Sequence, residues 1–185
     1  MAYNRLTIEG YGQLELNNVA FPRDGRVEAQ CKLNATDFAS KVAENGMLLA
    51  VDNVAREIKL PTDASLPIAI NYSAEHMYNQ YHRALKDFKL TKDDVYPRLG
   101  YLSVGDKFTT NCVGYDTSDY ATETALLTAL EPAALASSPV YGGYSADGSI
   151  AIVDTKPSDG PVLRVIAKTT MPDGTIGIKF QVYGV

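Results

Sequence analysis

Few residues in this chain have the types and spacing that metal chemistry requires. The only histidines, His76 and His82, are six positions apart, so on one helix they would point to different faces. A helical metal pair needs a spacing of three or four residues. Asp116 and Asp119, with the more distant Asp93–Asp94, form one notable carboxylate grouping. That grouping lacks the glycine and the terminal glutamate of a calcium loop, so we expect solvated turns and no metal site.

The thiols and hydroxyls show no catalytic arrangement either. Cys31 and Cys112 are the only cysteines, and their wide spacing fits neither a zinc motif nor a disulfide framework. We expect both to be buried as small apolar residues. No serine lies in a Gly-x-Ser-x-Gly elbow, and the glycine pair of Tyr141–Tyr144 lacks the lysine and the following helix of a phosphate loop. We therefore expect no enzymatic activity and no cofactor.

Tyrosine is the one residue type that suggests a binding role. The chain has 12 tyrosines, 5 phenylalanines and no tryptophan. Tyrosine gives a large contact area at low entropic cost and is enriched at protein interfaces. Four tyrosines lie in stretches that read as turn-rich, and we take them as the candidate partner interface: Tyr115, Tyr120, Tyr141 and Tyr144. The alternative is that these rings cover sheet edges and seal loops.

Composition limits both the architecture and the partners. A chain of 185 residues with 45% apolar and 21% charged residues fits one globular domain spanning residues 1–185. The net charge of −5 and the scattered basic residues disfavour nucleic acid as a partner. No stretch approaches about 20 consecutive apolar residues, so we expect no membrane partner. The first residues lack the apolar core of a signal peptide, and we expect none.

Asp-Gly pairs predict how the chain is built. Both residues tolerate positive φ, which suits the turns of β-hairpins. Three such pairs separate strand-like segments: Asp24-Gly25, Asp147-Gly148 and Asp173-Gly174. Asp52-Asn53 is either a fourth hairpin turn or part of a helix. We expect a β-rich fold, all-β to α+β: an antiparallel, hairpin-built sandwich or partly open barrel with one or two short helices.

Hydrophobic spacing predicts the helices. Met77, Tyr81, Leu85 and Phe88 share one face of a helix over Ala74–Phe88, which is the main helix we expect. A shorter helix over Asp37–Asn45 follows from Phe38 and Val42, with Gly46 as its C-terminal glycine. The segment Ala121–Ser138, rich in Ala, Leu, Thr and Ser, is either a short helix or a mobile loop that orders against a partner.

The last strand predicts part of the core. Ile176, Ile178, Phe180 and Val182 alternate with less apolar residues, as in a half-buried antiparallel strand. We expect this face to pack with Val165 from the preceding strand and with the apolar face of the main helix.

The middle of the chain resembles a known class of proteins. Leu85–Phe88, Asp94–Arg98 and Ser103–Asn111 are similar to structural proteins of tailed bacteriophages, the small proteins encoded close to the major capsid protein. The resemblance covers about thirty residues. It implies a virion component, assembled in the host cytoplasm, that binds the major capsid protein or another virion protein. No catalytic residues come with it.

The resemblance and the lack of catalytic groups together give the expected function. We expect a non-enzymatic structural component of a phage particle that binds the capsid lattice as an auxiliary or decoration protein. A homo-oligomer under the local symmetry of that lattice is compatible with this function. The alternatives are a tail or head-fibre component, a β-sandwich module that binds a ligand or carbohydrate, and an enzyme with a dispersed site.

Overall fold

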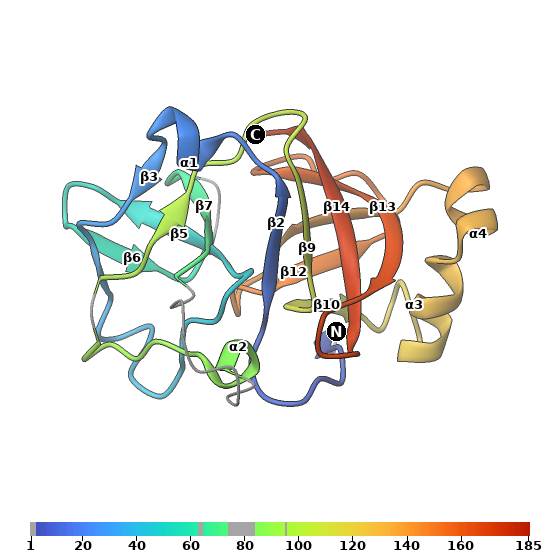
Figure 1. The fold of residues 1–185 in the computed structure, drawn as a ribbon, viewed down its shortest axis with the longest axis horizontal. Coiled ribbons are helices and arrows are strands. Elements are labelled where there is room, and N and C mark those ends of the chain that lie inside the picture. Colours follow the sequence, from blue (N-terminus) through green and yellow to red (C-terminus); the bar gives the residue numbers. More distant parts are fainter. Residues whose placement is uncertain (1–2, 63–64, 74–83, 95) are drawn as a thin grey trace.

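The computed structural model describes residues 3–62, 65–73, 84–94 and 96–185. Its strands form two mixed, mostly antiparallel sheets that lie beside one another, with short helices at their margins (Figure 1). Neither sheet closes into a barrel in the described part of the chain. The predicted β-rich class is confirmed.

The larger sheet has eight strands. Their order is β1 (Tyr3–Arg5), β10 (Val113–Asp116), β12 (Ile150–Val153), β11 (Tyr141–Tyr144), β13 (Val162–Thr170), β14 (Ile176–Gly184), β9 (Lys107–Thr110) and β2 (Leu14–Asn18). Neighbouring strands are antiparallel except for the parallel pair of β10 and β12.

The smaller sheet has six strands, and all of them come between β2 and β9 in the sequence. Their order is β3 (Val27–Glu28), β8 (Leu99–Gly100), β7 (Ile68–Asn71), β5 (Leu48–Asp52), β6 (Glu57–Lys59) and β4 (Lys32–Leu33). The smaller sheet is thus an insertion within the larger one. In each sheet the two edge strands, β1 with β2 and β3 with β4, are neighbours in the sequence.

Two of the three predicted Asp-Gly hairpins are confirmed. Asp147-Gly148 joins β11 to β12, and Asp173-Gly174 joins β13 to β14, each as an antiparallel pair. Gly148 and Gly174 have φ of 88° and 87°, the left-handed region that glycine adopts without strain. The open choice at Asp52-Asn53 is settled as a hairpin between β5 and β6.

The hairpin predicted at Asp24-Gly25 is wrong. Phe21–Asp24 forms a single helical turn, α1, and Gly25 ends it with φ of 71°. Pro22 suits the first turn of a helix because the missing N–H has no partner there. The carbonyl of Ala20 accepts hydrogen bonds from the N–H groups of Arg23 and Asp24. The same dipeptide therefore ends a helical turn here, because the preceding proline favours a turn over a strand.

The short helix predicted over Asp37–Asn45 is also wrong. This stretch consists of turns, and Ala43 makes an isolated bridge with Leu90. The side chain of Asn34 accepts hydrogen bonds from the backbone N–H groups of Thr36 and Asp37. An Asx-type turn thus replaces the first helical turn. Phe38 and Ala43 are nevertheless buried, so the apolar spacing marked the core correctly.

The predicted main helix lies mostly outside the described residues. Only its end is described, as the short helix α2 (Ala84–Asp87). His76, His82, Met77 and Tyr81 fall outside the described residues, and the side chain of Leu85 is not described either. Phe88 is half-buried against the core of the smaller sheet.

The segment Ala121–Ser138 forms two helices, α3 (Glu123–Ala129) and α4 (Pro132–Ser137), which project from one side of the larger sheet (Figure 1). The Thr122 hydroxyl caps α3 by accepting the Ala125 N–H at 3.1 Å. Pro132 lies in the first turn of α4. No helix of the described residues is long and apolar enough to cross a membrane.

One core cluster draws on both sheets. Phe108 and Phe180, whose ring centroids are 5.6 Å apart, are buried with Val182 of the larger sheet and with Leu48 and Ile70 of the smaller sheet. The predicted burial of Ile178, Phe180, Val182 and Val165 is confirmed. The prediction for Ile176 is wrong, since its side chain is 38% exposed. Ile176 begins β14 beside the hairpin turn, where it pairs with the exposed Thr170.

Candidate partner-binding surface

The structure separates the four tyrosines that the sequence grouped together. Tyr115 and Tyr120 are 5% and 8% exposed and belong to the shared core cluster. Tyr141 and Tyr144 are half-buried in β11. Tyr115, Tyr141 and Tyr144 lie in strands, not in turn-rich stretches as expected from the sequence. Burial removes Tyr115 and Tyr120 from any outer surface, so only Tyr141 and Tyr144 remain in positions where a partner could reach them.

Tyr144 forms part of a surface hollow of about 460 Å³. We call it the Tyr144 hollow; it is lined by Asp119, Gly143, Tyr144, Ala151, Val153 and the loop 154–159. The Tyr144 hydroxyl donates to Asp159 Oδ2 at 2.6 Å, which ties the loop to β11. Gly160, at φ of 64°, follows this loop, and a Cβ there would lie 2.8 Å from the Tyr144 ring. The glycine therefore lets the loop pass closely over the ring.

The Tyr144 hollow has an acidic end. Burial, and then the charges of Asp154 and Asp116, raise the pKa of the Asp119 carboxyl. Burial, and then Asp154 and Asp119, raise the pKa of the Tyr120 phenol to about 12. Both shifts have the direction that nearby negative charge produces. This end of the hollow suits a cationic group on a partner, although Lys156 in the same loop offsets part of the charge.

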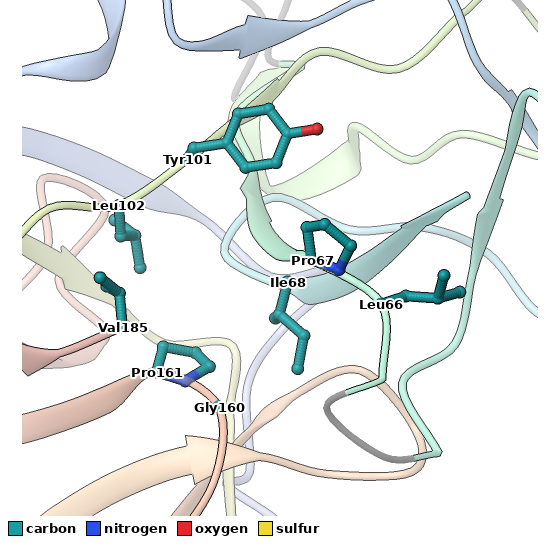
Figure 2. Close-up of a pocket in the computed structure, with 8 residues that line it drawn as sticks. All are labelled: Leu66, Pro67, Ile68, Tyr101, Leu102, Gly160, Pro161 and Val185. Carbon is teal, nitrogen blue, oxygen red and sulfur yellow. The ribbon is translucent and has the colours of Figure 1, made fainter. Parts of the chain in front are cut away.

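A second hollow lies where the two sheets meet (Figure 2). We call it the junction groove; its volume is about 400 Å³, and four chain segments line it: residues 66–68, 101–102, 160–161 and 185. Figure 2 shows the side chains of Leu102, Val185, Pro161 and Ile68 gathered around it, with the Tyr101 ring at one end. The lining contains no charged side chain, and the Tyr101 hydroxyl is its one polar side-chain group. Aliphatic side chains therefore predominate in its walls, with polar backbone atoms between them.

The carboxylates that the sequence singled out are held within their own turns. Asp116 accepts hydrogen bonds from the N–H and hydroxyl of Ser118, which lower the pKa of its carboxyl. Asp94 accepts in the same way from Thr91, and the pKa of its carboxyl is also lowered. The described residues contain no group of three or more His, Cys, Asp or Glu side chains that could hold a metal ion.

Both cysteines are free and buried, as predicted. Burial raises the pKa of the Cys31 thiol to about 11 and raises that of Cys112 still further. A thiol must ionise to act as a nucleophile, so neither cysteine is prepared for that chemistry at neutral pH.

A buried polar network beside Cys112 was not expected from any sequence pattern. Arg5 donates to both carboxylate oxygens of Glu44, at 2.7 and 2.9 Å, and the Gly12 N–H donates to the same carboxylate at 2.6 Å. Nearby, the Tyr3 hydroxyl and Ser149 Oγ are 2.5 Å apart. These partners are far apart in the sequence and follow no motif. Their arrangement ties β1 to other parts of the fold, which is a structural role.

No family model, curated protein or solved structure matches this chain.

Proposed function

We propose that this chain is a non-enzymatic structural component of a phage particle, which binds the capsid lattice as an auxiliary or decoration protein through the Tyr144 hollow. The observation that supports this contact is the hollow itself, which combines the half-buried Tyr144 with an acidic end. The hydrogen bond from Tyr144 to Asp159 holds the loop beside it in place. A surface that is already ordered loses less entropy on binding. The capsid as partner rests on the resemblance to phage structural proteins.

The side-chain chemistry supports a role without catalysis. The thiols are buried with raised pKa values, and the carboxylates of Asp94 and Asp116 hold their own turns. The carboxylates of Asp119 and Asp154 are like charges at one end of the Tyr144 hollow, and they would attract a cationic group on a partner.

Co-sedimentation with purified capsids tests the proposal. Wild-type protein should saturate the particles at a fixed ratio to the major capsid protein. The Tyr141→Ser and Tyr144→Ser double variant should lower occupancy while the far-UV spectrum stays native, and Tyr144→Ser alone should account for the loss, because Tyr141 does not line the hollow. Tyr183→Ser is the matched control, because Tyr183 is 46% exposed on β14 and outside the hollow. Full capsid occupancy by the double variant would show that the contact does not lie in the Tyr144 hollow. If wild-type protein did not bind capsids at all, the capsid proposal would be wrong.

Salt provides a second test of the same contact. If the acidic end of the hollow meets a cationic group, binding should weaken between low and high ionic strength, because exposed charges are screened. Asp154→Asn should reduce that salt dependence relative to wild type. Separate assays on purified heads and purified tails decide between a capsid protein and a tail component.

A further inference from the structure

The tip of the β5–β6 hairpin carries an exposed apolar side chain. Val54 is 97% exposed, more than any other large hydrophobic residue of the described chain. Its neighbours Asn53, Ala55 and Arg56 are exposed as well. A single exposed aliphatic residue needs no explanation by itself. The backbone conformation that holds Val54 in this position does need an explanation.

The hairpin tip is held in one conformation. Asp52 Oδ1 accepts hydrogen bonds from the Val54 and Ala55 N–H groups at 3.1 and 2.8 Å, and Asp52 Oδ2 accepts from Lys59 Nζ at 2.7 Å. Arg56 has φ of 58°, a left-handed conformation that residues with side chains rarely adopt. The Arg56 carbonyl accepts the Lys32 N–H, which fixes the strained residue. Strain of this kind persists where the surroundings enforce it, often at binding sites.

The junction groove lies next to this tip. The Val51 N–H, just before the tip, donates to the Pro67 carbonyl at 2.8 Å, and the Asn53 side chain lies near the Tyr101 hydroxyl. Pro67 and Tyr101 both line the groove. An apolar projection and an apolar hollow are therefore neighbours on one part of the surface.

The charges beside the projection and the groove are opposite. Arg56 is exposed beside Val54, and no ion pair of Arg56 is present among the described residues. Asp159 is exposed and directly precedes Gly160, which lines the groove. A valine with an arginine beside it thus complements an aliphatic groove with an aspartate beside it.

We propose that this chain forms a two-fold dimer in which Val54 of each copy enters the junction groove of the other copy, with Arg56 facing Asp159. Because the projection and the groove are adjacent, one two-fold axis between them allows both insertions at once. The contact is isologous and stops at two copies. It concerns self-association and is tested without capsids, although it shares Asp159 with the lining of the Tyr144 hollow.

Cysteine cross-linking tests the pairing directly. Separate Val54→Cys and Pro67→Cys variants are mixed and oxidised mildly; the native thiols are buried and do not interfere. Val104→Cys is the matched control, since Val104 is 67% exposed on another loop. The disulfide between Val54→Cys and Pro67→Cys should form at least about tenfold faster than the one between Val104→Cys and Pro67→Cys, because docking raises the effective concentration. Equal rates would overturn the proposal.

A charge exchange tests the same contact without cysteines. In sedimentation equilibrium, Arg56→Glu should weaken dimerisation, and adding Asp159→Arg to it should restore dimerisation; Asp159→Arg alone also removes the hydrogen bond from Tyr144 and does not test the contact by itself. Two independent losses of stability would add to each other, so they could not restore dimerisation in the double variant. Wild-type protein that stays monomeric at about 1 mM, the upper end of weak association, would overturn the dimer. A monomeric protein that binds a small apolar dye in its junction groove would also overturn the dimer.

Discussion

At the scale of single residues, Glu44 shows how charge is accommodated inside this fold. Its side chain is 7% exposed, and its carboxylate receives the two donors of Arg5 and the Gly12 N–H. A buried carboxylate with too few donors is costly, whereas a bidentate guanidinium satisfies both oxygens. Arg5 itself is 31% exposed, so water still reaches one side of the pair. The pair therefore fixes geometry more than it adds net stability.

Phe180 and Ile176 give a prediction that separates the buried from the exposed end of one strand. Phe180 is fully buried against Phe108, and Phe180→Ala should lower the free energy of unfolding by about 3–5 kcal/mol. Ile176→Ala on the same strand should change it by less than about 1 kcal/mol, because that side chain is 38% exposed. Urea denaturation of both variants measures the difference. Similar losses of unfolding free energy in the two variants would contradict the burial of Phe180 and the exposure of Ile176.

Asp119 gives a prediction for pH. The pKa of its carboxyl is raised in the folded protein, so the protonated form is favoured by folding. The stabilising effect of that proton is complete below the unfolded pKa of about 4 and disappears as pH rises through the folded pKa. Asp119→Asn should therefore raise the melting temperature relative to wild type at pH 7. The gain should shrink toward pH 3, where wild-type Asp119 is already protonated. An equal gain in melting temperature at pH 7 and pH 3 would show that charge repulsion at Asp119 is not the cause.

At the scale of elements, the local chemistry of turns decided how far the sequence could predict the fold. The hairpins at Asp147-Gly148 and Asp173-Gly174 were predictable because the turn residues and the flanking strands agree. Asp24-Gly25 failed because Pro22 had already started a helical turn. The pairing of β10 with β12 is parallel and joins residues far apart, which no local pattern encodes. Sequence spacing thus predicted elements, not their order in the sheets.

The candidate sites show the same limit. Tyr144 was named from residue type alone, and the structure places it in a hollow. Tyr115 and Tyr120 were named on the same ground, but they are buried because tyrosine is as able to fill a core as a surface. The junction groove could not be predicted, since its four lining segments come from residues 66 to 185 and only the packing of two sheets brings them together.

The two confirmed hairpins give a matched prediction about glycine. A Cβ added to Gly174 would have no atom within 4 Å, so Gly174→Ala should cost only the backbone strain of positive φ, about 1 kcal/mol. A Cβ on Gly148 would lie 3.2 and 3.3 Å from the side chains of Leu49 and Leu60. Gly148→Ala should therefore cost more than Gly174→Ala in thermal or urea unfolding. An equal cost would show that these leucines adjust freely.

At the scale of the whole molecule, the two sheets are joined by packing and by charge. The shared core cluster takes Leu48 and Ile70 from the smaller sheet and Phe180 from the larger one. The ion pair adds a second link, because Arg5 lies in β1 and Glu44 lies between β4 and β5. An inserted sheet held in this way should not unfold separately from the sheet that contains it.

The last prediction follows from that joining. In urea, amide NMR signals of Ile70 in β7 and Phe180 in β14 should disappear with one midpoint, since their side chains belong to one cluster. Arg5→Met should lower that midpoint for both signals, at a cost of about 2–3 kcal/mol, which is below the range for a fully buried pair because Arg5 is partly exposed. Arg23→Met, at an exposed position of α1, is the control and should change stability by less than about 0.5 kcal/mol. If Arg5→Met shifted only the Phe180 signal, the smaller sheet would be stable without the larger one, and the shared cluster would be a contact between two independent units.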